Sequence, residues 1–431
     1  MNDTPFFQKI ERLSQSKTRF HVPGHKGNIT AIPKFAAILP YDITEIEGAD
    51  NLQNPTAELA QSQENMAKLY QSGATLYSAN GSTSCIEAML NLFLCPKDKI
   101  IIARNCHISA VRAMGFIGAE PIWLYPQKAQ PQALEIEKLL WDTDAKTVYI
   151  TSPDYYGNMA DISSIRRACD RHNAILLVDN AHGAHLKFLP QDIHPLTLGA
   201  DACTDSAHKT LPCLTGAAML HLKNAALAKR ARQLLNRYSS TSPSYLILAS
   251  LDSVCGGLKN GIFNFAHITE QVSRIREEFC DWILPVDDPF KITLCPEKIG
   301  YTTTEINKEL VYDGIYPEFV SDRYIVLMAS TSNTNIDFSL LSKILKGFTP
   351  KAPLVTELEK LSPPTIMCNL REAMFAPSIE VNTCVAAGRI AATVQTPCPP
   401  GIPVVVPGEK ITPNIVRMLM KSGILTVDVV K

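Results

Sequence analysis

The chain has 431 residues, which is enough for a large buried core and favours two domains. Hydrophobic residues make up 46% of it, and 41 basic side chains face 42 acidic ones, for a net charge of −1. This balance offers no basic field for nucleic acid or for an anionic membrane, so neither partner is expected. The N-terminus lacks a signal-peptide pattern, and no apolar run is long enough to span a bilayer. We therefore expect a cytoplasmic protein.

The 12 cysteines are scattered and form no C-x-x-C pair. No histidine-rich spacing typical of metal ligands accompanies them. In a chain of this size they are predicted to be reduced core residues, and no metal site is expected.

From about residue 74 to 222, short apolar runs alternate with helix-compatible stretches. Such alternation predicts an α/β fold with a mostly parallel sheet and helices on both of its faces. The predicted strands are 75–78, 99–103, 121–124, 147–151, 174–179 and 217–220.

A possible phosphate-binding turn, Asn80-Gly81-Ser82-Thr83-Ser84, lies between the first predicted strand and a helix-like stretch at 86–94. Glycine permits a tight turn, the hydroxyls can donate hydrogen bonds, and the N-H groups at a helix start attract an anion. Taken alone the motif is weak, because hydroxyl residues cap many helices.

A lysine and an aspartate complete a cofactor pattern. Lys209 lies in Ser206-Ala207-His208-Lys209-Thr210 after a strand-like run, and Asp179 ends the predicted strand 174–179. A lysine can form a Schiff base with pyridoxal 5'-phosphate (PLP), and a buried aspartate can keep the pyridine nitrogen protonated. Either residue alone would more often be structural, but with the phosphate turn they predict PLP binding.

The second half of the chain is helix-rich from about 223 to 280 and then changes to short strands and helices. We predict a major domain with an N-terminal arm at 1–288 and a smaller α+β domain at 289–431. Proline-rich stretches at 351–364 and 397–408 are predicted to be connections, and such rigid loops can line a site.

On its motifs, the chain resembles the ornithine/lysine/arginine decarboxylases of PLP fold type I, in the short bacterial form without an N-terminal wing domain. The resemblance covers most of the chain and is highly specific. Its motifs are residues 20–27 (FHVPGHKG), 42–45 (DITE), 80–84 (NGSTS), 104–107 (RNCH), 151–157 (TSPDYYG), 178–185 (VDNAHGAH), 206–212 (SAHKTLP), 371–373 (REA), 388–390 (GRI), 400–403 (PGIP) and 407–409 (PGE).

The resemblance implies an aspartate aminotransferase-like fold with a smaller C-terminal α+β domain, and a homodimer or higher homo-oligomer. It implies that Lys209 holds PLP as an internal aldimine, that Asp179 pairs with the pyridine nitrogen and that His107 stacks on the ring. His208 or the freed Lys209 amine would donate the proton, and the sequence does not choose between them. The remaining cofactor contacts would come from Ser82, Thr83, Ser84, Ala181, His182, Ser206 and His208.

Five positions depart from the family pattern: Gln53, Ile108, Asp154, Asn180 and Gly216. Glutamate commonly follows the cofactor aspartate where this chain has Asn180. None of the five is a cofactor-holding position, so they bear on the substrate and the reaction.

The predicted reaction is decarboxylation of lysine, arginine or ornithine to the corresponding amine and CO2. Another PLP reaction (amino transfer, aldol-type cleavage or elimination) or a non-catalytic PLP-holding protein are the alternatives, because the cofactor residues do not fix which bond breaks. The distal cation of the substrate needs an anionic partner, for which Glu372 is the first choice ahead of Glu45, Glu47 and Asp50. His25 and Lys26 are further candidates for substrate contact.

Overall fold

The computed structural model describes residues 3–15, 18–354, 363–396 and 401–431. The chain divides into two compact units, each built from separate parts of the sequence. Unit 1 comprises Met1–Leu92 and Leu176–Ala266, and unit 2 comprises Phe93–Ile175 and His267–Lys431. These units group residues that are close in space, whereas the predicted boundary at 288/289 divides the continuous sequence into two domains. The domain boundary therefore stays a prediction.

Unit 1 contains four strands that are hydrogen-bonded in the order β1-β7-β6-β5. β5 and β6 are parallel, whereas β7 is antiparallel to both β6 and β1. β1, β5 and β6 therefore all run in the same direction. The bounds are β1 (Ala74–Ser78), β5 (Ile175–Asp179), β6 (Ala202–Asp205) and β7 (Ala218–Leu222).

The antiparallel direction of β7 differs from the simple parallel alternation that the sequence predicts. Between β6 and β7 the only helix is α7 (Ala207–Thr210), which has 4 residues. A parallel return needs a crossover of about a dozen residues or more, usually with a full helix. A one-turn helix is too short to cover the sheet and return, so the chain reverses instead.

Two of the other helices of unit 1 have clear signals at their N-termini. Asp50 accepts hydrogen bonds from Leu59 N and Ala60 N in the first turn of α2, and Ser244 caps α9 by accepting from Ile247 N. The bounds are α1 (Pro5–Ser14), α2 (Glu58–Tyr70), α3 (Gly81–Phe93), α8 (Ala228–Leu235) and α9 (Tyr245–Lys259).

The first part of unit 2 is a three-stranded parallel arrangement, β4-β2-β3, with helices between successive strands. Its central strand, Ile100-Ile101-Ile102, is fully buried, as expected for a strand covered on both faces. The bounds are β2 (Lys99–Ala103), α4 (Ile108–Ile117), β3 (Glu120–Leu124), α5 (Ala133–Asp142), β4 (Thr147–Thr151) and α6 (Ile162–Arg171).

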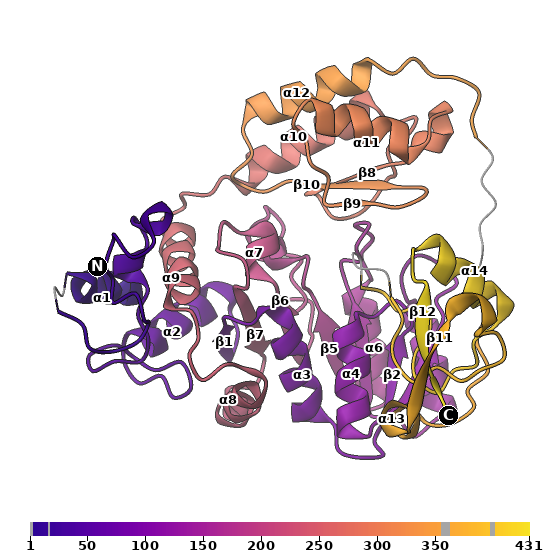
Figure 1. Cartoon of the computed structure of the whole chain (residues 1–431), viewed down its shortest axis with the longest axis horizontal. Helices are drawn as coiled ribbons and strands as arrows, with labels where there is room; N and C mark the ends of the chain where they lie inside the picture. The colour runs from indigo at the N-terminus through magenta and orange to yellow at the C-terminus, as the bar shows by residue number, and fades with distance from the viewer. Residues whose placement is uncertain (1–2, 16–17, 355–362, 397–400) are drawn as a thin grey trace. The chain divides into compact units, whose positions relative to one another are not determined.

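The rest of unit 2 holds two small antiparallel sheets (Figure 1). Helices α10, α11 and α12 lie beside the sheet β8-β10-β9 (Figure 1). Helix α14 packs on the hairpin β11-β12 through an apolar cluster that includes Ile415, Leu419 and Val429. The bounds are α10 (Phe265–Glu278), β8 (Lys291–Leu294), α11 (Thr303–Tyr312), β9 (Phe319–Val320), β10 (Ile325–Met328), α12 (Asn335–Lys346), α13 (Leu370–Phe375), β11 (Ser378–Asn382), α14 (Pro413–Lys421) and β12 (Thr426–Val430).

All six predicted strands between 74 and 222 are confirmed, with ends that shift by at most two residues. The eleven cysteines in the described residues form no disulfide, and Cys398 lies outside those residues. Six of the eleven are buried as predicted, whereas Cys95, Cys280 and Cys384 are exposed. Among the described helices, none combines the length and apolarity that a membrane span requires.

Candidate functional site

Three strand ends bring the sequence-predicted residues of unit 1 to one edge of its sheet. Because β1, β5 and β6 run in the same direction, their carboxyl ends lie at the same edge. Gly81 follows β1, Asp179 ends β5, and Ser206 follows β6. Ligands of open α/β sheets bind outside this edge, so the fold of unit 1 itself assembles a candidate site.

The turn after β1 is held by the loop before β7. Gly81 has a φ of +70°, which glycine adopts without strain, and its N-H donates to the Gly216 carbonyl at 2.8 Å. The Ser206 hydroxyl donates to the Ser82 hydroxyl at 2.7 Å. Two hydroxyls thus meet beside the N-terminus of α3, a suitable place for a phosphate.

The next two hydroxyls of this turn have different surroundings. Thr83 is exposed, whereas Ser84 is buried. Ser84 Oγ donates to the Gly81 carbonyl at 3.0 Å and lies 2.8 Å from Ser78 Oγ. Ser84 therefore fastens the turn internally, and its predicted cofactor contact remains a prediction.

Lys209 lies on α7 with its amine beside an imidazole. Its Nζ is 3.0 Å from His182 Nε2. The preceding His208 donates from Nδ1 to the Ala217 carbonyl at 2.9 Å, because a carbonyl can only accept. In neutral His208 the lone pair is therefore on Nε2.

Asp179 is buried at the end of β5. Its Oδ1 accepts a hydrogen bond from Ala181 N at 3.1 Å, which fixes the start of the segment that also carries His182. Burial of the carboxylate strengthens its interaction with a nearby positive charge. Ala181 itself is 7% exposed.

The residues of unit 1 fit PLP by their chemistry. A phosphate monoester needs donors at a helix start, which Ser82 and Ser206 supply, and an aldehyde needs a primary amine, which Lys209 supplies. A pyridinium nitrogen needs a buried anion, for which Asp179 has the right chemistry.

His107 belongs to unit 2, where it caps α4. Its Nδ1 accepts from Ser109 N at 3.2 Å and lies 2.8 Å from Ser109 Oγ. A side chain at Gly401 would lie 2.8 Å from the His107 ring, and Ile108 N donates to the Gly401 carbonyl at 3.0 Å. The predicted loop 400–403 thus meets His107 at Gly401, while Pro400 lies outside the described residues. Stacking of His107 on the cofactor remains a prediction.

The three substrate candidates lie in different settings. Glu372 is exposed in the first turn of α13, where its N-H donates to the capping Asn369 at 2.7 Å. His25 Nε2 is 3.2 Å from Asp42 Oδ2 in unit 1. Lys26 is exposed and donates to the His21 carbonyl at 2.7 Å.

Two of the five departures from the family pattern have clear structural roles. Asp154 is buried and accepts from the backbone of Tyr156, Gly157 and Asn158, each at 2.9 Å, which shapes the turn after β4. Burial raises the pKa of Asp154, and these hydrogen bonds oppose that rise. Gly216, at φ +99°, supports Gly81 as described above.

The other three departures are Gln53, Ile108 and Asn180. Gln53 accepts at its carbonyl from Asn236 Nδ2 at 2.8 Å, and Ile108 begins α4. Asn180 is buried, and its Nδ2 donates to Asp205 Oδ1 at 2.7 Å.

Sequence reasoning missed a buried polar cluster next to this site, formed by His194, Asp205 and His221. Asp205 directly precedes Ser206, so a carboxylate at a strand end was a visible signal. The two histidines lie in a loop and on β7, and only the fold brings them to Asp205.

Comparison with known proteins identifies the family of this chain. The sequence family described as Orn/Lys/Arg decarboxylase, major domain, matches residues 4–279, and its C-terminal domain matches residues 372–422. The chain is 31% identical to "Uncharacterized protein YaaO" of Bacillus subtilis (strain 168), covering 97% of this chain and 94% of the relative. It is 29% identical to a protein named arginine decarboxylase from the same organism, covering 98% and 94%.

A solved structure shows the same fold. The lysine decarboxylase LdcF of Francisella novicida superposes with a TM-score of 0.82 at 19% identity, covering 99% of this chain and 81% of that one. The predicted fold class, PLP fold type I with a small C-terminal α+β part, is therefore confirmed. A family match over more than half of the sequence, with lysine, aspartate and hydroxyls at one sheet edge, shows that the chain belongs to the Orn/Lys/Arg decarboxylase family of PLP-dependent amino-acid decarboxylases.

Proposed function

We propose that this protein removes the α-carboxylate of a basic amino acid (lysine, arginine or ornithine) as CO2 and releases the corresponding diamine or polyamine precursor. The observation that carries the proposal is the arrangement of Lys209, Asp179 and the Ser82–Ser206 hydroxyl pair on the strand ends of unit 1. The family match and the relative named arginine decarboxylase favour a basic substrate.

Each residue has a task in this reaction. Bound PLP supplies an electron sink for the electrons of the broken carbon–carboxylate bond. Ser82 and Ser206 bind the phosphate, and Asp179 holds positive charge at the pyridine nitrogen by electrostatic attraction. Lys209 anchors the cofactor through its amine.

We assign proton transfer to two histidines. His182 Nε2, 3.0 Å from Lys209 Nζ, can take a proton from this amine and return it. His208 keeps its Nδ1 proton in the hydrogen bond to the Ala217 carbonyl, so Nε2 is the nitrogen that can bind and release a second proton. The Lys209–His182 contact adds His182 to the two proton carriers that the sequence suggests.

A substrate panel tests the function. We expect CO2 release from lysine, arginine or ornithine to exceed that from leucine and glutamate by about a hundredfold or more, a difference of about 3 kcal/mol in transition-state binding. Keto-acid formation is measured in parallel. Keto acid without CO2 would favour amino transfer, and PLP binding without turnover of any amino acid would favour a non-catalytic role.

The carboxylate of Glu372 is the proposed partner of the distal cation. We expect Glu372→Gln to raise the apparent KM for the preferred basic amino acid by about tenfold, since an amide lacks the charge that attracts an ammonium or guanidinium. The visible absorbance of the bound cofactor should be unchanged.

A matched control is Glu305→Gln. Glu305, like Glu372, lies in the first turn of a helix, where it forms a capping box with Thr302 at the start of α11. We expect this variant to keep its KM, and glutamine can still close the capping box. Equal KM values for wild type and Glu372→Gln would remove Glu372 from the substrate pocket.

A homodimer is the proposed active form. The exposed side chains of residues 20–38, which we call the N-terminal arm, support it. Six large apolar side chains between residues 20 and 38 are at least 43% exposed, with Phe20 at 94%. Exposed apolar groups at this density mark interaction surfaces. These residues are Phe20, Val22, Ile29, Ile32, Phe35 and Ile38.

We expect sedimentation at assay concentration to show a dimer or larger, and the double variant Phe20→Ser/Phe35→Ser to shift it towards monomer with a parallel loss of activity. Leu134→Ser is the control, because Leu134 is 79% exposed on α5, outside the arm. A fully active monomer would rule out the dimer proposal.

A further inference from the structure

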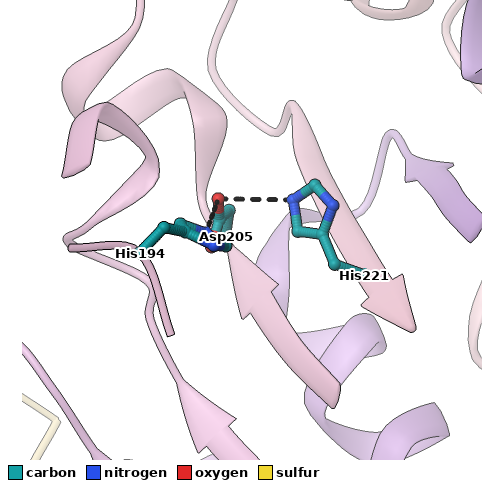
Figure 2. A group of neighbouring side chains, drawn as sticks. All are labelled: His194, Asp205 and His221. Atoms are coloured by element: carbon teal, nitrogen blue, oxygen red, sulfur yellow. Dashed lines mark hydrogen bonds and ion pairs between the residues drawn. The ribbon is translucent and has the colours of Figure 1, made fainter. Parts of the chain in front are cut away.

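Asp205 carries a buried negative charge between two imidazoles. Figure 2 shows its carboxylate between His194 and His221, and all three side chains are fully buried. His194 Nε2 lies 3.2 Å and His221 Nε2 3.3 Å from Asp205 Oδ2. Asn180 Nδ2 donates a hydrogen bond to Oδ1 at 2.7 Å. Such a buried carboxylate is tolerable only because it is surrounded by donors.

The polarity of one outer contact fixes the tautomer of His194. The backbone N-H of Leu196 points at His194 Nδ1 at 3.4 Å, and Thr75 Oγ1 lies 2.8 Å from His221 Nδ1. An N-H donor requires an unprotonated Nδ1, so His194 carries its proton on Nε2 and donates to Asp205. Burial alone would raise the pKa of Asp205, but its interactions with His194 and His221 outweigh this and hold the pKa well below its usual range.

The same polarity argues against a metal ion at this cluster. A histidine that binds a metal through Nε2 normally donates its other N-H to an acceptor. His194 instead meets a donor at Nδ1. His194 and Asn180 therefore donate hydrogen bonds to the Asp205 carboxylate, and His221 makes an ion-pair contact with it.

The first arm of this cluster is the hydrogen bond between Asp205 and Asn180, which reaches the segment that carries Asp179 and His182. Asp205 holds the side chain of Asn180, the residue directly after Asp179. The Asn180 carbonyl accepts from Gly183 N at 2.8 Å, and its side-chain amide packs so closely on Gly183 that a Cβ there would collide with it. Asp205 thus fixes the turn 180–183 from its inner side.

A second arm reaches the same segment through Tyr70. The Tyr70 ring stacks on His221, with centroids 4.3 Å apart, and meets His194 edge-on at 5.1 Å. Its hydroxyl donates to the Ala184 carbonyl at 2.9 Å. The segment 179–185 is therefore held on both sides of His182 by contacts that converge on Asp205.

We propose that Asp205, with His194, His221 and Tyr70, is the positioning centre of the cofactor site. It sets the backbone that carries Asp179 and His182 and, through the chain, the adjoining Ser206. Asp205 acts through Asn180 and does not itself touch cofactor or substrate. The inference rests on PLP binding at this site, which belongs to the proposed function, but not on decarboxylation.

The test is Asp205→Asn, measured by PLP affinity and by the visible circular dichroism of the bound cofactor. The amide has one accepting oxygen in place of two and places an NH2 group among donors. We expect the PLP dissociation constant to rise by about tenfold or more, about 1.4 kcal/mol, with an altered dichroism that reports a changed cofactor orientation.

Asp201→Asn is the matched control. Asp201 precedes β6, and its Oδ2 accepts from Leu176 N at 2.8 Å, so it joins the same two strands at their opposite ends. We expect a loss of thermal stability with PLP affinity within about twofold of wild type and unchanged dichroism. Both variants are compared well below their unfolding temperatures, which separates positioning from stability.

Two milder variants keep the inference testable if Asp205→Asn does not fold. Asn180→Ala removes the first arm, and Tyr70→Phe removes only the hydroxyl of the second. We expect each to weaken PLP binding by several-fold. If Asp205 acts through Asn180, the double variant Asp205→Asn/Asn180→Ala binds PLP no more weakly than Asp205→Asn alone, whereas independent effects would add.

Three results would overturn the inference. The first is wild-type PLP affinity and dichroism in Asp205→Asn or in both milder variants, and the second is additivity in the double variant. The third is stoichiometric zinc or another divalent metal in the purified protein that is lost in Asp205→Asn. A wild-type protein that binds PLP without releasing CO2 would contradict the proposed function alone. PLP affinity and circular dichroism could still be compared between the wild type and the Asp205 variant, so the inference would still be tested.

Discussion

Lys209→Ala is expected to abolish the visible absorbance of the lysine-bound cofactor and to reduce CO2 release to the background of free PLP. The amine of Lys209 lies beside His182 at the sheet edge that also carries Asp179 and the Ser82–Ser206 hydroxyl pair. No substitute amine can form the covalent link from an alanine at this position. Absorbance spectra after PLP addition, with activity on the preferred basic amino acid, measure the effect.

Lys26→Ala is the control for this prediction, because Lys26 is the other lysine in a family motif. Its Nζ donates to the His21 carbonyl, and the side chain is exposed. We expect Lys26→Ala to keep the visible absorbance. A lysine adduct that borohydride still traps in the Lys209→Ala protein would show that the anchoring lysine was wrongly assigned.

Much of the α/β arrangement could be predicted because apolar periodicity is a local property. The buried run at residues 100–102 and the strand ending at Asp179 were both visible as uninterrupted apolar stretches between polar turns. Once strands are parallel, their carboxyl ends share one edge, so a strand end with a carboxylate and another followed by Ser206 already predict a common site.

The direction of β7 could not be predicted from its residues. Ala218-Met219-Leu220 has the same apolar texture as a parallel core strand, and it is the short connection through α7 that reverses the chain. Apolar content reports burial, whereas strand direction depends on the length and geometry of the connection.

The cluster around Asp205 could not be predicted for a related reason. His194 comes from a loop, His221 from β7 and Tyr70 from the end of α2, and no spacing in the sequence relates them. In a sequence each looks like an ordinary residue near apolar neighbours, and only the pairing of β6 with β7 and the packing of α2 bring them together.

Asp179→Asn is expected to leave the protein folded and able to hold PLP through Lys209 and the phosphate contacts, while lowering kcat by about a hundredfold or more. Removing one group that acts electrostatically in the transition state typically costs on the order of 3 kcal/mol or more. The substituted side chain would still accept from Ala181 N, since its amide oxygen can replace Oδ1 of the carboxylate. Because the amide is neutral, it cannot hold the pyridine nitrogen protonated.

The effect of Asp179→Asn must be on kcat rather than on folding, and Asp201→Asn separates the two. Both substitutions remove a carboxylate beside β5 and β6, but Asp201 lies at the ends of these strands away from Lys209. We therefore expect Asp201→Asn to keep kcat while losing stability. Activity of Asp179→Asn within about tenfold of wild type, a change of about 1.4 kcal/mol, would mean that another group stabilises the charge on the cofactor. Asp179 would then be a buried residue that stabilises the fold and does not act on the cofactor.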